Sequence, residues 1–442
     1  MRRILNFLFV CCIASCAFAE TRTQFSEASL LDILVAKNAI TAEEAEEIKK
    51  ASSEVPVCEP VSVQSFRTLF ISQMRYTYVY HDYSNTPFDV NDESRFNFRR
   101  LLPVFIADLT PNSMLMLSLY MPSSTLINTL HYEINLDGDV LAGKLKLGHW
   151  CVNFSMEEND SCSIIKAPDR SILCIYFGGG DSGYDGYMKT SYGTALGFSG
   201  YHTGVYWDGH IPAHKEFVYS LDVVNSKPND IFVRNDNGIS CFLTAAYDGK
   251  FDGWSLKVGS AFGYSNKIVS AIEGASVLPS EVEDFGDALG VNPFVRFTYG
   301  DLSLDGEFFL TSLRYGRTHS DTVPLYTTHS GQAVPWGFYV LCAYKVYKSD
   351  RWGEFEPVFR FTYLDTDGRG VRGCDVVYNM RSANGLYDNA TAYYGGVNWY
   401  LDGRNFKVAA GIEHFDFRDS PLGGSKASVS SDVAILQFQM VF

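Results

Sequence analysis

The chain has 442 residues, a formal net charge of −15 and 46% hydrophobic residues, including 27 Tyr, 32 Phe and 6 Trp. This length suits two or three ordinary domains or one large barrel. The acidic charge argues against nucleic acid as a partner, because that binding depends on clustered Lys and Arg.

The N-terminus is typical of an exported protein. Two arginines precede an apolar run, and residues 17–19 (Ala-Phe-Ala) fit a cleavage site, which predicts a signal peptide over residues 1–19. As an alternative, residues 13–16 (Ile-Ala-Ser-Cys) resemble a bacterial lipobox, in which case Cys16 would carry lipid. No later stretch reaches the ~18–20 apolar residues that a transmembrane helix needs.

Residues 29–50 are the segment with a clear helical pattern. Four apolar residues form one face of a first helix, and Thr41 with Glu44 makes a capping box for a second short helix. Two prolines follow. The sequence therefore predicts a periplasmic helical hairpin and linker over 20–63, ahead of a second region over 64–442.

From residue 64 onward the apolar residues recur with period two, which indicates β-strands with one apolar and one polar face. One example is the alternation of Leu130, Tyr132, Ile134 and Leu136 with polar neighbours. Sixteen strands are predicted, over 66–81, 95–108, 113–121, 128–136, 141–150, 192–207, 216–225, 240–247, 254–264, 292–300, 302–313, 336–348, 354–364, 390–401, 404–416 and 432–442.

Tight and long connections alternate between these strands. Short turns such as 110–113 and 401–405 alternate with long polar stretches such as 157–191 and 265–291. That alternation is typical of an all-β, transmembrane antiparallel barrel of about 16 strands, with short periplasmic turns and longer outer loops. A soluble β-sandwich or secreted β-rich hydrolase is the alternative, but Tyr, Phe and Trp gather towards strand ends, as the aromatic girdles of a membrane barrel do.

A barrel of this size is expected to hold water. The sheet must close because hydrocarbon satisfies no backbone hydrogen bond, and about sixteen strands leave a lumen that side chains cannot fill. This predicts a porin for passive diffusion of small hydrophilic solutes or ions, and no enzyme. A structural or adhesive barrel with a closed lumen is the alternative.

Five stretches together resemble the phosphate-selective porins O and P of Gram-negative bacterial outer membranes. Residues 95–109 resemble that family's Phe-Arg-Arg strand, 145–159 its Leu-Lys-x-Gly motif, and 395–415 its penultimate hairpin. Residues 436–442 and 30–50 are similar to its ending and to its N-terminal segment. The resemblance implies an outer-membrane homotrimer of sixteen-stranded barrels whose channel is lined with arginine and lysine.

The family resemblance and the polar faces of the predicted strands both indicate arginine and lysine as pore-lining residues. Arg99 and Arg100 occupy the Phe-Arg-Arg positions and Lys146 the Leu-Lys-x-Gly position. Arg100 falls on the apolar face, so either a bulge re-aims it or it lies at a rim. Residues expected to line the pore and to bind anions are Arg75, Arg95, Arg99, Arg100, Lys144, Lys146 and Arg360.

Inward carboxylates give a competing interpretation of these charges. Glu133, Asp305, Glu307, Glu356 and Glu413 also point inward by parity. Charges of both signs can pair across the lumen and merely solvate it, so anion preference, phosphate specificity and general diffusion all stay open. Small solutes or inorganic anions are the expected cargo.

The resemblance also implies that a loop after an early strand folds into the pore, and 157–191 is the best candidate. Its Lys166, Arg170 and Lys189 are the constriction candidates. The Gly-rich part, 176–187, is interpreted as an outer loop.

Other motifs indicate no cofactor and no metal. Histidines 202, 210 and 214 cluster, but in a turn and not on the helix that an i,i+4 ligand pair needs. The mature chain keeps seven cysteines, an odd number. Cys162 and Cys174 can bridge, or most of the thiols are free and buried.

The last strand ends in SDVAILQFQMVF. Phe438, Met440 and Phe442 share an apolar face, and the ending resembles the signal that barrel-assembly machinery recognises. This strand is expected to pair with the first, because closure removes both sheet edges. Lipid of the outer membrane is the expected partner of its apolar face.

Overall fold

The structure is a computed structural model of the chain, which divides into the units Met1–Ser62 and Val63–Phe442. It describes residues 63–82, 92–121, 127–138, 142–178, 196, 198–226, 238–266, 287–314, 317–319, 328–368, 370–372, 386–419 and 428–442. The predicted signal peptide, helical hairpin and linker lie outside the described residues, and so does most of 176–187.

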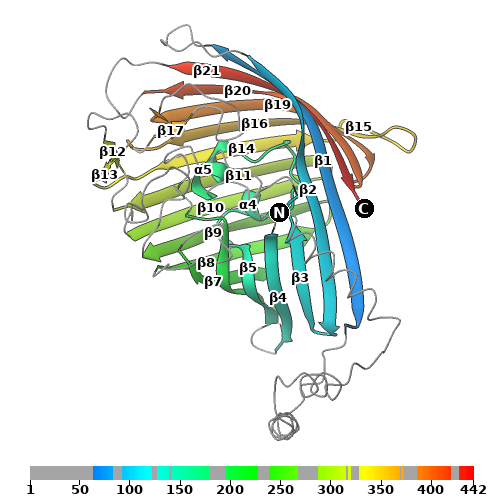
Figure 1. Ribbon diagram of the computed structural model, residues 1–442. Coiled ribbons are helices and arrows are strands. Elements are labelled where there is room, and N and C mark those ends of the chain that lie inside the picture. Colours follow the sequence, from blue (N-terminus) through cyan, green and yellow to red (C-terminus); the bar gives the residue numbers. More distant parts are fainter. Residues whose placement is uncertain are drawn as a thin grey trace, which may run out of the picture. The chain divides into compact units, whose positions relative to one another are not determined.

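The second unit is a closed antiparallel barrel (Figure 1). Its sheet has 17 strands, and sixteen of them form the wall, because β15 only extends the turn between β14 and β16. Each wall strand pairs with its neighbours in the chain, and β21 pairs with β1. The predicted count of sixteen is therefore confirmed.

The strands are β1 Ser65–Asp82, β2 Glu93–Thr110, β3 Ser113–Leu119, β4 Ile127–Asp137, β5 Ala142–Cys151, β6 Tyr201–Ile211, β7 His214–Asn225, β8 Ile239–Phe251, β9 Trp254–Asn266, β10 Asp287–Tyr299, β11 Leu302–Leu313, β12 Arg317–His319, β13 Thr328–Ser330, β14 Trp336–Tyr344, β15 Tyr347–Ser349, β16 Gly353–Asp365, β17 Val371–Arg372, β18 Leu386–Tyr387, β19 Asn389–Asp402, β20 Phe406–Arg418 and β21 Val429–Val441. Two short helices are α4 Met156–Asn159 and α5 Ile172–Gly178. Among the described residues, no helix is long and apolar enough to cross a membrane.

The strand that closes the barrel shows why period two predicts the wall. Along β21, Leu436 and Met440 are exposed on the outer face, whereas Gln437 and Gln439 are buried inside. β21 pairs with β1 from Ile71↔Val441 to Asp82↔Ser430. The expected seam between the last and first strands is confirmed.

Aromatic side chains gather at the ends of the strands. At the short-turn end, Phe251 stacks on Trp254 at 4.0 Å between ring centroids, and Phe355 stacks on Trp399 at 5.5 Å. At the other end Trp336 lies 5.2 Å from Tyr363. Rings at both interfaces are what a lipid-facing barrel needs.

The largest difference in boundaries concerns β6, predicted at 192–207 and found at Tyr201–Ile211. Residues just before it do not continue the sheet. The Phe198 N–H donates to the Phe177 carbonyl at 2.9 Å, and the Val152 N–H donates to the Gly200 carbonyl at 2.9 Å. The chain therefore returns from α5 through the lumen before it joins the wall.

Candidate functional site

The lumen holds a segment between β5 and β6, residues 152–178, which we call the inserted segment. It contains α4 and α5, and both lie inside the barrel in Figure 1. The segment belongs to the connection that was expected to fold inward. Its path determines which part of the lumen stays free.

α4 begins under a wall carboxylate. The Ser155 hydroxyl accepts from the Glu158 N–H at 3.1 Å, as an N-cap does. The Glu307 carboxylate of β11 accepts from the Met156 and Glu157 N–H groups at 3.1 and 2.5 Å. Glu307 thus satisfies backbone donors that a helix start leaves unpaired.

The stretch 162–169 follows the wall with successive backbone carbonyls attached to different strands. Five polar side chains donate to these carbonyls, at 2.8–3.1 Å: Gln73 of β1 to Cys162, Gln439 of β21 to Ser163, Lys407 of β20 to Ile165, Asn398 of β19 to Lys166, and Arg360 of β16 to Asp169. These donors replace the water that a loop backbone normally needs. The stretch is therefore held against β1, β16 and β19–β21.

Asp169 is the centre of an arginine cluster. Its carboxylate is fully buried and pairs with Arg75 and, at 2.7 Å, with Arg99 Nε. Arg100 is buried beside them and donates to Gln73 at 2.8 Å. Burial alone would raise the pKa of Asp169, but the attraction of the three arginines overcomes it and holds that pKa well below its usual range.

A bulge explains how both adjacent arginines turn inward. The register of β1 with β2 shifts so that Gln73 faces Arg100 and Met74 faces Phe98, which leaves Arg99 as the extra residue. Of the two alternatives for Arg100, the bulge is the one found.

A second ion-pair network joins the inserted segment to β16 and β20. Arg360 donates to Glu157 at 3.2 Å and to Glu413 at 2.9 Å, and the Glu157 carboxylate accepts from the Ser171 N–H at 2.9 Å. Burial raises the pKa of Glu157, an effect that Arg360 and Ser171 only partly offset.

Glu158, the next residue of α4, is buried as well. Burial raises its pKa to about 7, although Arg170 and a 3.0 Å hydrogen bond from Ser199 favour the charged form. Arg170 itself donates to the carbonyls of Glu157, Glu158 and Asp160 at 2.8–3.1 Å, so it holds the end of α4.

The other expected site residues are found as follows. Lys166 pairs with Glu356 at 2.5 Å, Lys146 with Asp208 at 2.6 Å and Lys144 with Glu133 at 2.8 Å. Arg95 is half-buried on β2, and Lys189 lies outside the described residues. The pore-lining and constriction roles of all these residues stay predictions.

Sequence reasoning missed the residue that compensates the arginines. The inward parity of Glu133, Asp305, Glu307, Glu356 and Glu413 was predicted correctly, because parity is local to a strand. Asp169 lies in a connection without periodicity. Its only signal was the adjacent pair Asp169-Arg170 within the proposed constriction.

The inserted segment is not polar throughout, and here the prediction of a long polar connection is wrong. All residues of α5 are buried. Phe177 stacks on Phe309 of β11 at 5.0 Å, and Phe154 meets Phe198 edge-on at 5.1 Å. Part of the expected water-filled lumen is therefore a dry apolar core.

Of the two alternatives for Cys162 and Cys174, the structure has the unbridged one, since both are free, buried thiols. Cys151, Cys241 and Cys342 are free as well, which agrees with the alternative of unpaired cysteines. Within the ranges that the structure describes, no group of His, Cys, Asp or Glu has the arrangement of a metal site.

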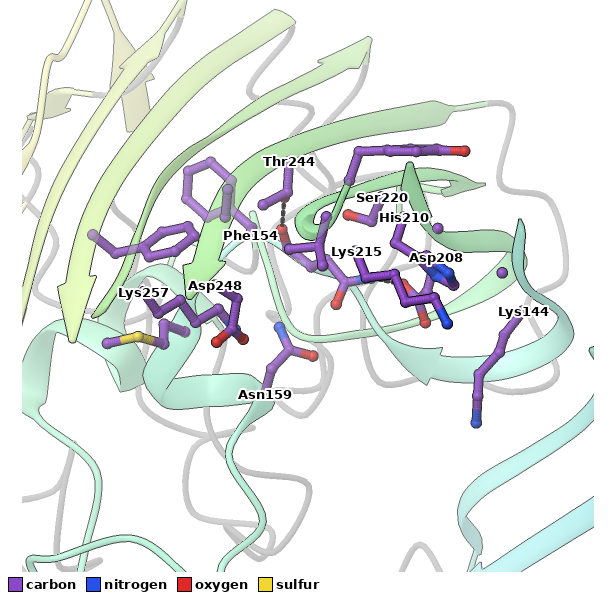
Figure 2. Close-up of a pocket in the computed structure, with 18 of the residues that line it drawn as sticks. Lys144, Phe154, Asn159, Asp208, His210, Lys215, Ser220, Thr244, Asp248 and Lys257 are labelled. Atoms are coloured by element: carbon purple, nitrogen blue, oxygen red, sulfur yellow. Dashed lines mark hydrogen bonds between the residues drawn. The ribbon is translucent and has the colours of Figure 1, made fainter. Parts of the chain in front are cut away.

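A cavity of about 800 Å³ lies between the inserted segment and the short-turn ends of β4–β10 (Figure 2). Asn153 forms part of its roof: its side chain donates to Asp208 at 2.7 Å, its N–H donates to Asp222 at 2.7 Å, and its carbonyl accepts from Thr244. The cavity opens towards the rim that faces the periplasm in barrels of this kind.

The fold, the inward-facing charges and the outward-facing aromatics define a bacterial outer-membrane porin, a barrel for passive diffusion. Residues 281–442 match the family model of Phosphate-selective porin O and P, which confirms the resemblance over the C-terminal part of the chain. No curated protein sequence matches the chain.

Solved porins share the fold at low sequence identity. The anion-selective porin from Comamonas acidovorans has a TM-score of 0.53 and 11% identity, over 86% of this chain and 99% of that one. Pseudomonas putida OprB gives 0.52 and 10%, over 85% and 94%. Salmonella typhi OmpF gives 0.51 and 12%, over 85% and 97%.

Proposed function

We propose that small solutes cross this porin on the side of the lumen bounded by β4–β10, and that anions are preferred. The observation that carries the proposal is the asymmetry of the inserted segment. Its carbonyls are attached to β1, β16 and β19–β21, whereas the cavity is lined from β4 to β10. Because the segment narrows the lumen, the passage suits small solutes.

The charge on the attached side supports anion preference. Arg75 and Arg99 pair with the buried carboxylate of Asp169, and Arg100 and Lys407 are buried in the same region. In a medium of low dielectric, a group of cations acts over several ångströms on a passing ion.

The test is conductance in a planar bilayer. Stepwise currents are expected, with a reversal potential in a KCl gradient that reports preference for chloride. Arg99→Ala is expected to lower that preference. Arg67→Ala is the matched control, because Arg67 is 60% exposed at the rim and pairs there with Asp108. An equal effect of both substitutions would contradict a role for the cluster.

A closed structural or adhesive barrel is the second candidate, favoured by the dry core around α5. It predicts silent bilayers and liposomes that exclude small sugars. Swelling of liposomes in such sugars excludes it.

We also propose that the protein forms a homotrimer and is inserted by barrel-assembly machinery. The family resemblance supports the trimer, and the 73% exposed Phe442 supports recognition of the final strand. Unheated gel electrophoresis of the purified protein, with mass determination in detergent, tests the trimer.

A further inference from the structure

The cavity beneath the inserted segment carries two opposite charges on neighbouring strands. Asp248 of β8 and Lys257 of β9 face each other in register, and both line the cavity. Among the described residues, neither forms an ion pair or a hydrogen bond. Figure 2 shows the two together at one side of the cavity.

A buried hydroxyl in the same wall also lacks a partner. Ser220 of β7 is 5% exposed, lines the cavity, and its Oγ has no hydrogen-bond partner among the described residues. A buried polar atom without a partner is unfavourable unless a ligand or water completes it. Ser220 therefore offers a third polar contact beside the two charges.

The remaining surface of the cavity is apolar. Met156, Ala246 and Phe294 form a small hydrophobic cluster with Val218 packed against it, and all four line the cavity. Lys257 Nζ lies 5.9 Å from the centre of the Phe294 ring, so the charged and apolar parts adjoin. The volume of about 800 Å³ lies in the range of small-molecule sites.

We propose that this cavity is a binding subsite for a free α-amino acid with an apolar side chain. Asp248 takes the ammonium, Lys257 the carboxylate, and the cluster around Phe294 the side chain. The neighbouring opposite charges of the site match the neighbouring opposite charges on one α-carbon. The proposal deepens the proposed function, since it names one class of solute that the pore would carry.

Weak binding at the pore entrance is consistent with transport. Conduction requires a site that favours entry and still releases the solute. Charges in contact with water at the cavity mouth give moderate attraction only, which salt screens. Binding is therefore expected to weaken as KCl is raised.

The experiment measures binding and needs no current. Calorimetric titration of the folded barrel in detergent uses L-phenylalanine, N-acetyl-L-phenylalanine without the ammonium, and L-phenylalaninamide without the carboxylate. Saturable binding of L-phenylalanine is expected, with each analogue about tenfold weaker, because each lacks one charge-assisted contact.

Substitutions of Asp248 and Lys257 test which side chain binds which charged group of the amino acid. Asp248→Asn is expected to remove the preference over the N-acetyl analogue, and Lys257→Met the preference over the amide. The matched controls are Asp252→Asn and Lys250→Met, which lie near the same turn and do not line the cavity. Heat-dependent gel mobility checks that every variant is folded.

Equal binding of the three probes, no saturable binding, or equal effects of the cavity and control substitutions would overturn the subsite. An absence of saturable binding and equal effects of the two sets of substitutions are also expected if Asp248 and Lys257 only neutralise each other. Selective binding by a barrel that is silent in bilayers would refute the proposed passage and keep the subsite. Conductance without binding would refute the subsite and keep the proposed passage.

Discussion

Asp169→Asn isolates the contribution of the arginine cluster to holding the inserted segment. The carboxylate is 0% exposed, and its partners Arg75 and Arg99 are 2% and 5% exposed. The amide keeps the shape and removes the charge, so both buried arginines lose the carboxylate that pairs with them. Removing one partner of a buried pair typically costs ~3–5 kcal/mol.

The loss of stability is expected in the attachment of the inserted segment and not in the strands of the barrel wall, which do not depend on Asp169. A loss of ~3–5 kcal/mol raises the population of the detached segment by roughly 10²- to 4 × 10³-fold. Hydrogen exchange of the amides in 162–178 is the direct assay. In bilayers, the same substitution is expected to shift the reversal potential further towards the equilibrium potential of chloride.

Asp108→Asn is the control for Asp169→Asn, because Asp108 forms an exposed pair with Arg67. Exposed pairs contribute ~0–1 kcal/mol. Equal exchange of the segment in the two variants would refute the reasoning. Because the pKa of Asp169 is depressed, its contribution is present above the ordinary Asp pKa of about 4 and is lost only as pH falls through the lower folded value. This anchor is therefore expected to be unchanged between pH 5 and 8.

Glu158 is expected to behave in the opposite way: since burial raises its pKa to about 7, its stabilising effect is complete below the ordinary pKa and is lost as pH rises through 7. The protection factors of the segment amides, which correct for the intrinsic pH dependence of exchange, should therefore be lower at pH 8 than at pH 5. Glu158→Gln should abolish that difference; a difference in protection that persists in the variant contradicts the assignment. Gly290→Ala should lower the thermal midpoint by an overpacking cost of ~1–3 kcal/mol, because its Cβ would lie 2.3 Å from the Phe198 ring. Gly395→Ala, whose Cβ meets nothing within 4 Å, is the control, and equal midpoints would count against the packing argument. Phe442→Ala should reduce the yield of folded barrel without changing the conductance of the molecules that assemble, whereas Phe442→Tyr should not; normal yield from the alanine variant argues against an assembly role.

Local patterns in the sequence determined the wall. Alternation along each strand is a property of two or three neighbouring residues, and the short turns carry their own turn-forming residues. For that reason the sixteen strands, the inward carboxylates and the seam between β21 and β1 follow from the sequence alone. The inward direction of Arg99 follows in the same way.

The tertiary structure decided the contents of the lumen. Ser163 meets Gln439 across 276 positions of the chain, and Lys407 meets Ile165 across 242. No local pattern encodes such contacts. The bulge that turns Arg100 inward also depends on pairing between two strands.

The late start of β6 and the dry core around α5 also depend on tertiary contacts. Residues 172–177 are apolar, and in isolation they suit a buried strand as well as a helix. Only the space enclosed by the closed wall lets them pack against Phe309 and its neighbours as a helix. The sequence by itself thus determined a sixteen-stranded outer-membrane barrel. The family resemblance implied that a loop enters the pore, but the path of the inserted segment, and with it the free side of the lumen, was decided by contacts that exist only once the barrel has closed.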